Sequence, residues 1–258
     1  MAESFPGAQA TARLLTQRLS SLLFRCGFYV ARSSDLHYWE SLLKGRGETV
    51  NSAFRPELHD EPADILVVHR GNDDAFAGTI AWRVLQTDDY VERRLRTGRQ
   101  WIAEPSAVDW QPYEISGAPR IAGRIHDRGG LYVDPAFRGH RISWYLTGLQ
   151  WAIALADQAD FVVSQTLPKI SATRLPQAVY GYEHFWPMPQ HHFPWRSEAF
   201  APALVWSDAQ AIRDEVARRL RYLRQRYAQD LGDAARGYER YQQAIEGSES
   251  LAVPAVHK

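Results

Sequence analysis

Two stretches of the chain, one near each end, carry apolar residues at helical spacing. From Leu14 to Leu23, leucines recur every few residues with arginines between them, and this pattern predicts an amphipathic helix within residues 1–26. A second stripe follows Ser207-Asp208-Ala209-Gln210, which has the form of a capping box, and predicts a long helix in a C-terminal extension, residues 207–258. The second stripe consists of Ile212, Val216, Leu220, Leu223, Tyr227 and Leu231, and arginines occupy the other faces of this helix.

The C-terminal helix has two interpretations. In the first, it covers the core of its own domain and its arginines face water. In the second, it contacts a partner, as a dimerisation helix or as a helix that binds RNA. The first is favoured because charged helix faces usually face solvent, and the second leaves a homodimer through this helix as an alternative.

Between these helices, residues 27–206 alternate strand-like and helix-like segments. A short strand precedes a helix whose N-cap is Ser33 or Ser34. Residues 63–70 and 76–86 have the pattern of two strands joined by a tight turn. The later segments follow in the order strand, helix, strand, short helix and strand. This order predicts an α/β (α+β) fold with helices flanking a mixed sheet that contains at least one parallel strand pair.

A long connection, residues 88–128, interrupts this alternation. It begins with a segment expected to be helical, "YVERRLRTGRQWI", and continues through proline- and glycine-punctuated sequence. Connections of this length are usually functional lids or mobile segments. We therefore expect the insert to line or cover a substrate site, with Trp101, Glu104 and Trp110 as contacts.

Composition narrows the classes of partner and compartment. The chain has 30 basic and 30 acidic side chains, so no bulk field attracts nucleic acid or an anionic membrane. A single cysteine, Cys26, excludes an internal disulfide and a thiolate metal cluster, and its use fits a reducing cytoplasm. The adjacent His191 and His192 diverge in direction and have no third ligand at metal-site spacing. We expect a cytoplasmic protein without a metal.

The segment "GGLYVDPAFRGHRIS", residues 129–143, has the elements of an anion site. Its strand ends at Pro135, which cannot donate a backbone hydrogen bond, so we expect the sheet to splay there. An extended ligand with amide groups could then pair with Tyr132 and Val133. Beyond the break, the loop enters a helix near Ile142, and free amides at a helix N-terminus favour a pyrophosphate.

These residues resemble the GNAT acyltransferase superfamily, in which a strand with V-x-P precedes a (Q/R)-x-x-G-x-(G/A) loop. Val133-Asp134-Pro135 matches the strand end, and Tyr180 keeps the family's five-residue interval to Phe185. The resemblance implies a GNAT-like mixed central sheet over residues 27–206, with the insert before the coenzyme-binding strand. The six loop positions, which the resemblance assigns to the pyrophosphate of the coenzyme, are Arg138, Gly139, His140, Arg141, Ile142 and Ser143.

The resemblance also implies the activity, which is transfer of an acetyl or other acyl group from acyl-coenzyme A to an amine. Acetyl-coenzyme A would be the cosubstrate, and the acceptor would be a small molecule or a peptide. Tyr180 would be the general acid that protonates the leaving thiolate. The general base stays open among His126, Asp127, Glu183 and Ser164.

His184 stands where the family usually has glycine, and "GGLYV" lacks the carboxylate that the family often places there. Two departures within the loop pattern leave other functions open. Arg141 stands where the loop usually has glycine, and Ser143 stands where it has glycine or alanine. Arg141 either clamps a phosphate or blocks the loop, and in the second case the protein would be a non-catalytic binding or scaffold protein. A further alternative is an acyl-coenzyme A-dependent synthase of signalling molecules, which would need a wide acyl tunnel.

Overall fold

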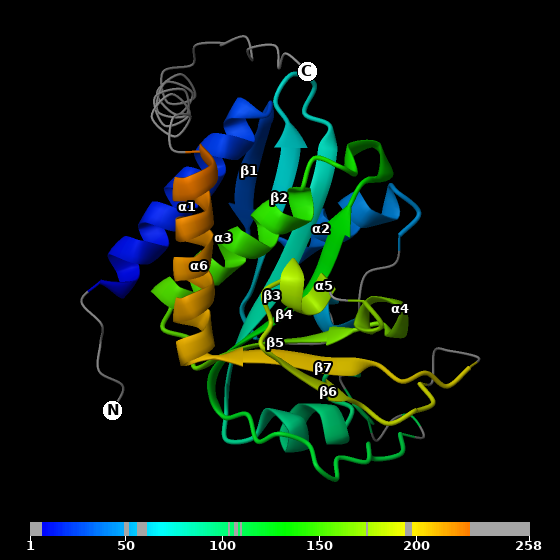
Figure 1. Ribbon diagram of the computed structural model, residues 1–258. Coiled ribbons are helices and arrows are strands. Elements are labelled where there is room, and N and C mark those ends of the chain that lie inside the picture. The colour runs from blue at the N-terminus through cyan, green and yellow to red at the C-terminus, as the bar shows by residue number, and fades with distance from the viewer. Residues whose placement is uncertain are drawn as a thin grey trace.

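A seven-stranded sheet forms the centre of the molecule, with strands in the order β1-β2-β3-β4-β5-β7-β6 (Figure 1). The computed structural model describes residues 7–48, 52–55, 61–102, 104, 105, 108, 110–173, 175–193 and 198–227. Neighbouring strands are antiparallel except β4 and β5, which are parallel, and the predicted mixed α/β sheet is confirmed. The strands are β1 (Phe28–Ser33), β2 (Ala63–Arg70), β3 (Phe76–Thr87), β4 (Gly123–Val133), β5 (Phe161–Thr166), β6 (His184–Pro187) and β7 (Ala203–Asp208).

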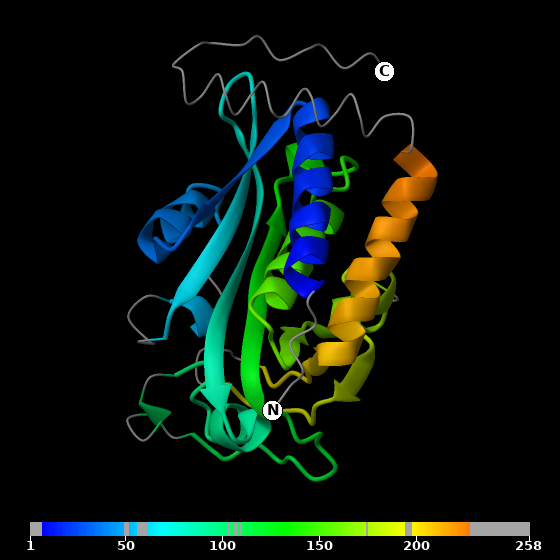
Figure 2. The ribbon, with the colours of Figure 1, turned by 90° about the vertical axis from the view of Figure 1, so that its left-hand side faces the viewer.

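The longer helices cover one face of this sheet. Helix α3 (Ile142–Ala156) lies against the sheet and is covered in turn by α1 (Ala8–Arg25) and α6 (Ala209–Tyr227), while α2 (Leu36–Lys44) packs on the opposite face (Figure 2). No helix within these described ranges is long and apolar enough to cross a membrane. The short helical segments are η1 (Ser52–Phe54), the π-helix η3 (Val91–Arg96), η5 (Pro135–Phe137), α4 (Pro168–Ser171) and α5 (Leu175–Ala178).

The predicted N-terminal helix is present as α1, and its leucine stripe supplies much of the core. Leu15, Leu19 and Leu23 are fully buried, and each such side chain contributes about 1.5–3 kcal/mol by leaving water. Helix α3 packs closely against α1 and α6 because Gly148 has no side chain at their contact. A Cβ at this position would lie 2.7 Å from Leu19 of α1 and 2.8 Å from Arg219 of α6. These contacts explain why α3 is apolar on nearly every side.

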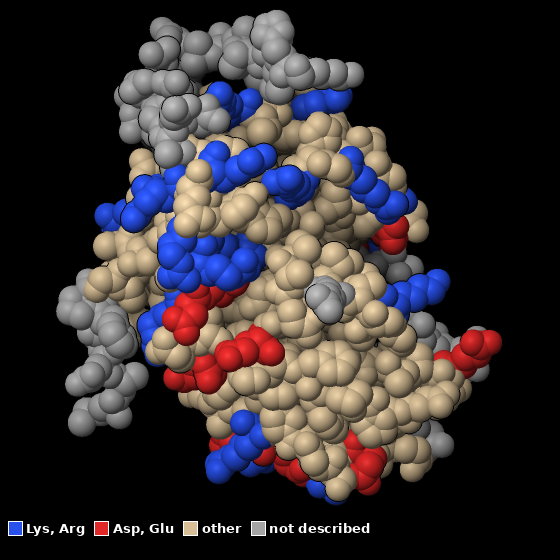
Figure 3. Space-filling model, viewed as in Figure 1, with Lys and Arg blue, Asp and Glu red and all other residues tan. Residues whose placement is uncertain are grey.

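Helix α6 is the predicted C-terminal helix, and its apolar stripe packs against the protein's own core. Ile212, Val216 and Leu223 are buried there, which confirms that the stripe covers the protein's own core. The expectation that the arginines face water is wrong for Arg219, which is fully buried and paired with Glu215. Arginines such as Arg221 and Arg224 are exposed, and basic side chains gather over this helix on the surface (Figure 3). Leu231 lies outside the described residues, and the homodimer stays a prediction.

Both predicted helix caps are wrong by a residue or two. Asp35, not Ser33 or Ser34, caps α2 by accepting a hydrogen bond from the Tyr38 amide. At α6, the Asp208 carboxylate accepts from the amides of Gln210 and Ala211, whereas the predicted cap, Ser207, is buried and accepts from the Glu183 amide. In both cases a carboxylate next to the predicted serine makes the capping bond, as the positive end of a helix dipole favours.

Three other element boundaries also differ from the prediction. Strand β4 begins at Gly123, so the insert ends before residue 123 rather than near residue 128, because the side chains of His126 and Asp127 are buried within a sheet. The helix expected from residue 90 is the short π-helix η3. The helix expected over residues 174–186 is only α5, and His184–Pro187 is the edge strand β6.

Candidate active site

The site begins where β4 separates from β5. The two strands pair only over Ile125–Asp127 of β4, and the rest of β4 pairs with β3 alone. The separation therefore starts at Arg128, well before Pro135, and the prediction that proline opens the sheet is wrong about the place. The physical cause is an irregularity in the β3–β4 ladder, where the register shifts between Thr79 and Ala81.

Gly130 lies in this irregular stretch. Its φ of +59° is a left-handed value that favours glycine, and a Cβ there would lie 2.4 Å from the Trp39 ring. The chain can therefore bend here only because the residue is glycine. After the bend, β4 leads away from β5 and leaves one of its edges open.

A cavity of about 390 Å³ lies between the separated strands. This volume falls within the usual range of small-molecule sites, roughly 300–1,000 Å³. Its walls include Gly129–Tyr132 of β4 and Ser164–Thr166 of β5, with Tyr180 and Tyr182 on one side and Leu43 and Glu48 on another. Of the two strand residues predicted to bind a ligand, Tyr132 lines this cavity and Val133 is not among its lining residues.

The open edge of β4 has a defined set of backbone groups. The Asp134 amide donates to the Ala77 carbonyl of the β3 side at 3.0 Å. Because hydrogen-bonding direction alternates along a strand, the amide of Val133 points away from β3, toward the separated β5, and Tyr132 directs its amide to β3. Leu131 lies in the irregular stretch and lines the cavity, and it is a ligand candidate that the sequence prediction missed.

The predicted anion loop follows at the end of β4. Gly139 and Arg141 both have left-handed backbone conformations, with φ of +96° and +59°, and Arg141 is the N-cap of α3. Among the described residues, no group accepts a hydrogen bond from the amides of Gly139, Arg141, Ile142 or Ser143. Free amides at the N-terminus of a 15-residue helix form an anion-binding surface.

Three side chains of this loop point away from its amides. Ile142 is buried in the core, and the His140 ring lies 5.4 Å from the Phe28 ring. The Arg141 guanidinium donates to the Tyr222 phenol of α6 at 3.3 Å. Its side chain is therefore drawn toward α6, and the Cβ position of Gly139 has no other atom within 4 Å.

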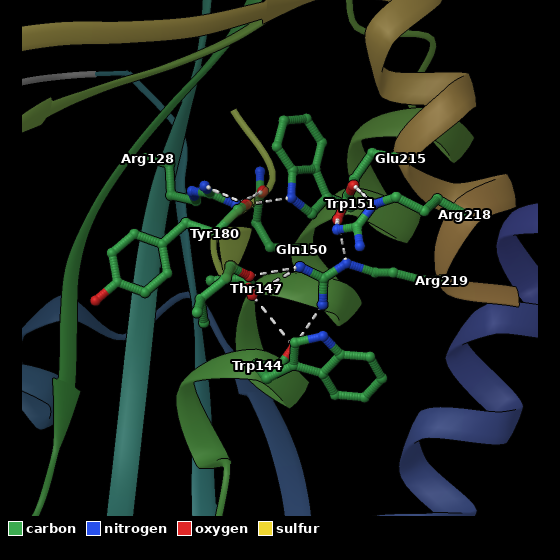
Figure 4. A network of polar contacts seen from close by, with 10 residues as sticks. Arg128, Trp144, Thr147, Gln150, Trp151, Tyr180, Glu215, Arg218 and Arg219 are labelled. Carbon is green, nitrogen blue, oxygen red and sulfur yellow. Dashed lines mark hydrogen bonds and ion pairs between the residues drawn. The ribbon is translucent and has the colours of Figure 1, made fainter. Parts of the chain in front are cut away.

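Tyr180 stands beside the cavity, just after α5. Its carbonyl accepts from the Trp151 indole at 2.7 Å and from the Arg128 guanidinium at 3.3 Å, while its ring points away from this network (Figure 4). The ring lines the cavity. Burial raises the pKa of the Tyr180 phenol above its ordinary value, although the Arg128 charge opposes this shift. The phenol therefore stays protonated near neutral pH.

Three comparisons with known proteins were made. No family model matches the chain, and no curated protein matches it. Similar solved structures include a mutant spermidine N-acetyltransferase SpeG from Vibrio cholerae (8% identity, TM-score 0.43, covering 72% of this chain and 96% of that one). FeeM, an N-acyl amino acid synthase from uncultured soil microbes, has 13% identity and a TM-score of 0.36, covering 82% of this chain and 91% of that one.

A third similar structure is an N-acetyltransferase from Staphylococcus aureus Mu50, with 8% identity and a TM-score of 0.42, covering 71% of this chain and 98% of that one. At these values no residue role is transferred from one chain to the other. The mixed sheet with its one parallel strand pair, the flanking helices and the long C-terminal helix are those that the sequence predicts. The chain has a GNAT-type fold.

Tyr182 and Arg128 also line the cavity, and the sequence prediction missed both of them. A helical segment would turn Tyr182 away from Tyr180, but the chain leaves α5 before Gly181, whose φ is +84°. A Cβ at Gly181 would lie 2.5 Å from Glu215, so this extended path needs glycine. Tyr180 and Tyr182 consequently line the same cavity.

The four candidates for a general base lie in different places. His126 and Asp127 are both buried, on opposite faces of β4: His126 lies 3.3 Å from Asp157, and Asp127 accepts from Gln100 at 2.5 Å. Glu183 is mostly exposed. Ser164 is the only one of the four among the cavity-lining residues.

Burial raises the pKa of Asp127 to about 6, opposed first by its hydrogen bond with Gln100. Tyr90 is within hydrogen-bonding reach of this carboxylate, and its phenol accepts from the Gln165 amide at 2.6 Å. Because Gln165 lines the cavity, Tyr90 and Gln165 connect the buried acid to the cavity wall. This connection comes from the start of the insert, where Tyr90 lies.

The insert residues that we expected to contact a substrate lie away from the cavity. Trp101 is buried in a cluster with Tyr113 and Phe193, and Trp110 packs 4.6 Å from the His191 ring. None of Trp101, Glu104 and Trp110 is among the residues that line the cavity. The insert thus forms a second small core beneath β5, β7 and β6.

Proposed function

We propose that this protein transfers an acyl group from acyl-coenzyme A to an amine. The observation that carries the proposal is the cavity between β4 and β5, which is lined by β4 as far as Tyr132, while the free amides at the start of α3 follow at the end of the same strand. The amide-containing thioester arm of the coenzyme would bind in the cavity and along β4, and its pyrophosphate would bind at the free amides. The donor we propose is acetyl-coenzyme A, with a small-molecule or peptide amine as the acceptor.

In this proposal, backbone groups bind most of the donor. The amides of Leu131 and Val133 would pair with the pantetheine arm as an added strand and polarise the thioester carbonyl. The amides of Gly139, Arg141, Ile142 and Ser143 would hold the pyrophosphate, and Arg138 adds positive charge beside them. Arg141 would act as a clamp, since the hydrogen bond that its side chain donates within the described residues, to Tyr222, is long.

The chemical step needs one proton donor from the protein. The amine nitrogen attacks the thioester carbonyl carbon, the C–S bond breaks, and an amide forms while the proton that the amine loses passes to water. Tyr180 would donate its phenolic proton to the leaving sulfur and then regain a proton from water. Its raised pKa keeps the phenol protonated before the C–S bond breaks.

The first experiment measures binding of acetyl-coenzyme A by thermal shift and calorimetry. We expect a rise in melting temperature that grows with ligand concentration. The absence of any shift at millimolar ligand would contradict the enzyme function and favour the non-catalytic binding protein. An amine panel would follow, including spermidine and amino acids, which are named with the similar structures.

The second experiment replaces Tyr180 by phenylalanine. We expect turnover to fall by about 100-fold or more, the usual contribution of a general acid, while affinity for acetyl-coenzyme A stays within about twofold. Tyr38→Phe is the matched control, because Tyr38 is exposed on α2. Unchanged turnover in Tyr180→Phe would remove this residue from the proton-donor role.

A further inference from the structure

Arg128 is a buried cation in the wall of the cavity. Its side chain is 4% exposed, and it is among the residues that line the cavity. It donates to the Tyr182 phenol at 2.7 Å, to the Gln150 side-chain oxygen at 3.0 Å and to the Tyr180 carbonyl at 3.3 Å. The rings of Trp151 and Tyr182 lie 4.9 and 4.3 Å from the guanidinium carbon. All of these partners are neutral groups, and Figure 4 shows Gln150, Trp151 and Tyr180 around Arg128.

No carboxylate in the described part of the chain lies within ion-pair distance of Arg128. The nearest acid of this network, Glu215, is already shared between Arg218 and Arg219. Arg128 also repels Arg219, because its charge contributes to lowering the Arg219 pKa. The Arg128 guanidinium is therefore buried with no carboxylate paired to it in the described part of the chain, and burying an unpaired charge is costly.

The guanidinium has donors left for a ligand. Arginine has five N–H groups, and the three recorded hydrogen bonds use one from each nitrogen. Two N–H groups thus have no recorded acceptor among the described residues. The hydroxyl of Ser164 and the phenol of Tyr182 line the cavity next to this side chain.

We propose that Arg128 is the receptor for a carboxylate group of the substrate, at the inner end of the cavity between β4 and β5. A planar guanidinium with free N–H groups matches a carboxylate in shape and charge, and the carboxylate would supply the missing counter-charge. This inference rests on the proposed acyl transfer and specifies its substrate class. The carboxylate belongs either to the acyl group of the donor or to the amine acceptor.

Two matched pairs of compounds distinguish these sources. Succinyl- and butyryl-coenzyme A have acyl chains of the same length, and only the first ends in a carboxylate. N-acetylphenylalanine and N-acetylphenethylamine are product-like ligands that differ only in a carboxylate, and their binding can be measured without coenzyme A. Calorimetry measures the binding of both members of each pair to the wild type and to Arg128→Gln, Arg128→Lys and Tyr182→Phe. For each protein we take the ratio of the two affinities within a pair. Partial unfolding of a variant lowers both affinities equally, so it does not change this ratio.

We expect the wild type to bind the carboxylate member of one pair at least about tenfold more tightly, as a charge-assisted hydrogen bond can provide. This ratio should fall to about one in Arg128→Gln and stay above one in Arg128→Lys and Tyr182→Phe, which keep the positive charge. Ratios near one for both pairs in the wild type would overturn the proposal, as would a preference that persists in Arg128→Gln. Failure of acetyl-coenzyme A to bind would contradict the proposed function instead, and the product-like pair would still test Arg128.

Discussion

Two fully buried charged residues near β4, Arg219 and Asp127, are stabilised in opposite ways. On the α3 side, Arg219 from α6 pairs with Glu215 at 2.5 Å and also donates to the Trp144 and Val179 carbonyls. On the insert side, Asp127 has only neutral hydrogen-bonding partners, the Gln100 amide and the Tyr90 phenol. Arg219 thus has an ion-pair partner, and its hydrogen bonds link α6 to α3. The negative charge of Asp127 is only partly compensated by its neutral partners.

The difference shows which polar groups hold the fold together and which can respond to pH. The Arg219 bonds connect α6 to α3 and to the chain just before Tyr180, so they position one wall of the cavity. Desolvation lowers the Arg219 pKa only to about 10, and this residue stays charged at any physiological pH. Asp127, with a pKa near 6, titrates close to that range.

The largest effect is expected from breaking the paired charge. Arg219→Met removes the hydrogen bonds to the Trp144 and Val179 carbonyls and leaves Glu215 with only Arg218, so we expect a loss of about 3–5 kcal/mol in the free energy of unfolding. Chemical denaturation measures this change. Arg221→Met on the exposed face of α6 is the control and should change stability by no more than about 0.5 kcal/mol. An equal effect of both substitutions would mean that the buried pair does not join the elements.

An intermediate effect with a pH signature is expected from Asp127→Asn. The folded-state pKa of Asp127, about 6, lies above its ordinary value of 3.8, so the native state binds more protons than the unfolded state between these values. Wild-type stability should therefore decrease as pH rises from about 4 to 6, by roughly 3 kcal/mol at most. Asp127→Asn should lose this dependence and be the more stable protein at pH 7.

Denaturation curves across this pH window measure the difference. Asp214→Asn, on the exposed face of α6, should leave the pH dependence as it is in the wild type. A pH dependence that survives in Asp127→Asn would show that another group causes it.

The smallest effect on stability is expected at Arg141, where the comparison extends to an exposed charge. Its φ of +59° favours glycine, and its one hydrogen bond, to Tyr222, is exposed. Arg141→Gly should therefore change the free energy of unfolding by less than about 1 kcal/mol. If Arg141 clamps a phosphate, Arg141→Gly should bind acetyl-coenzyme A several-fold more weakly than the wild type. If Arg141 instead blocks the loop, the variant should bind more tightly. Calorimetry distinguishes the two outcomes.

Hydrophobic periodicity predicts most elements of this fold because each element buries one continuous apolar face. The stripes of α1 and α6 and the hairpin of β2 and β3 follow directly from the spacing of their residues. Hydrophobic periodicity does not predict the first part of β4, because His126, Asp127 and Arg128 have the pattern of a polar loop. Each of these side chains is buried with a hydrogen-bond or ion-pair partner that is distant in sequence, such as Gln150, Asp157 or Gln100.

The sequence by itself determined most of the strands and helices along the chain and the mixed character of the sheet, because each element's apolar pattern lies in residues near each other in the chain. The anion loop and the role of Tyr180, which come from local motifs, stay predictions. Only the tertiary structure decided where the sheet opens, since Gly130 must avoid Trp39 from another element. It likewise decided that Tyr182 lines the cavity and that Arg128 is a buried cation without an acid partner among the described residues. These properties depend on which distant side chains meet in the folded protein, and no local pattern records that.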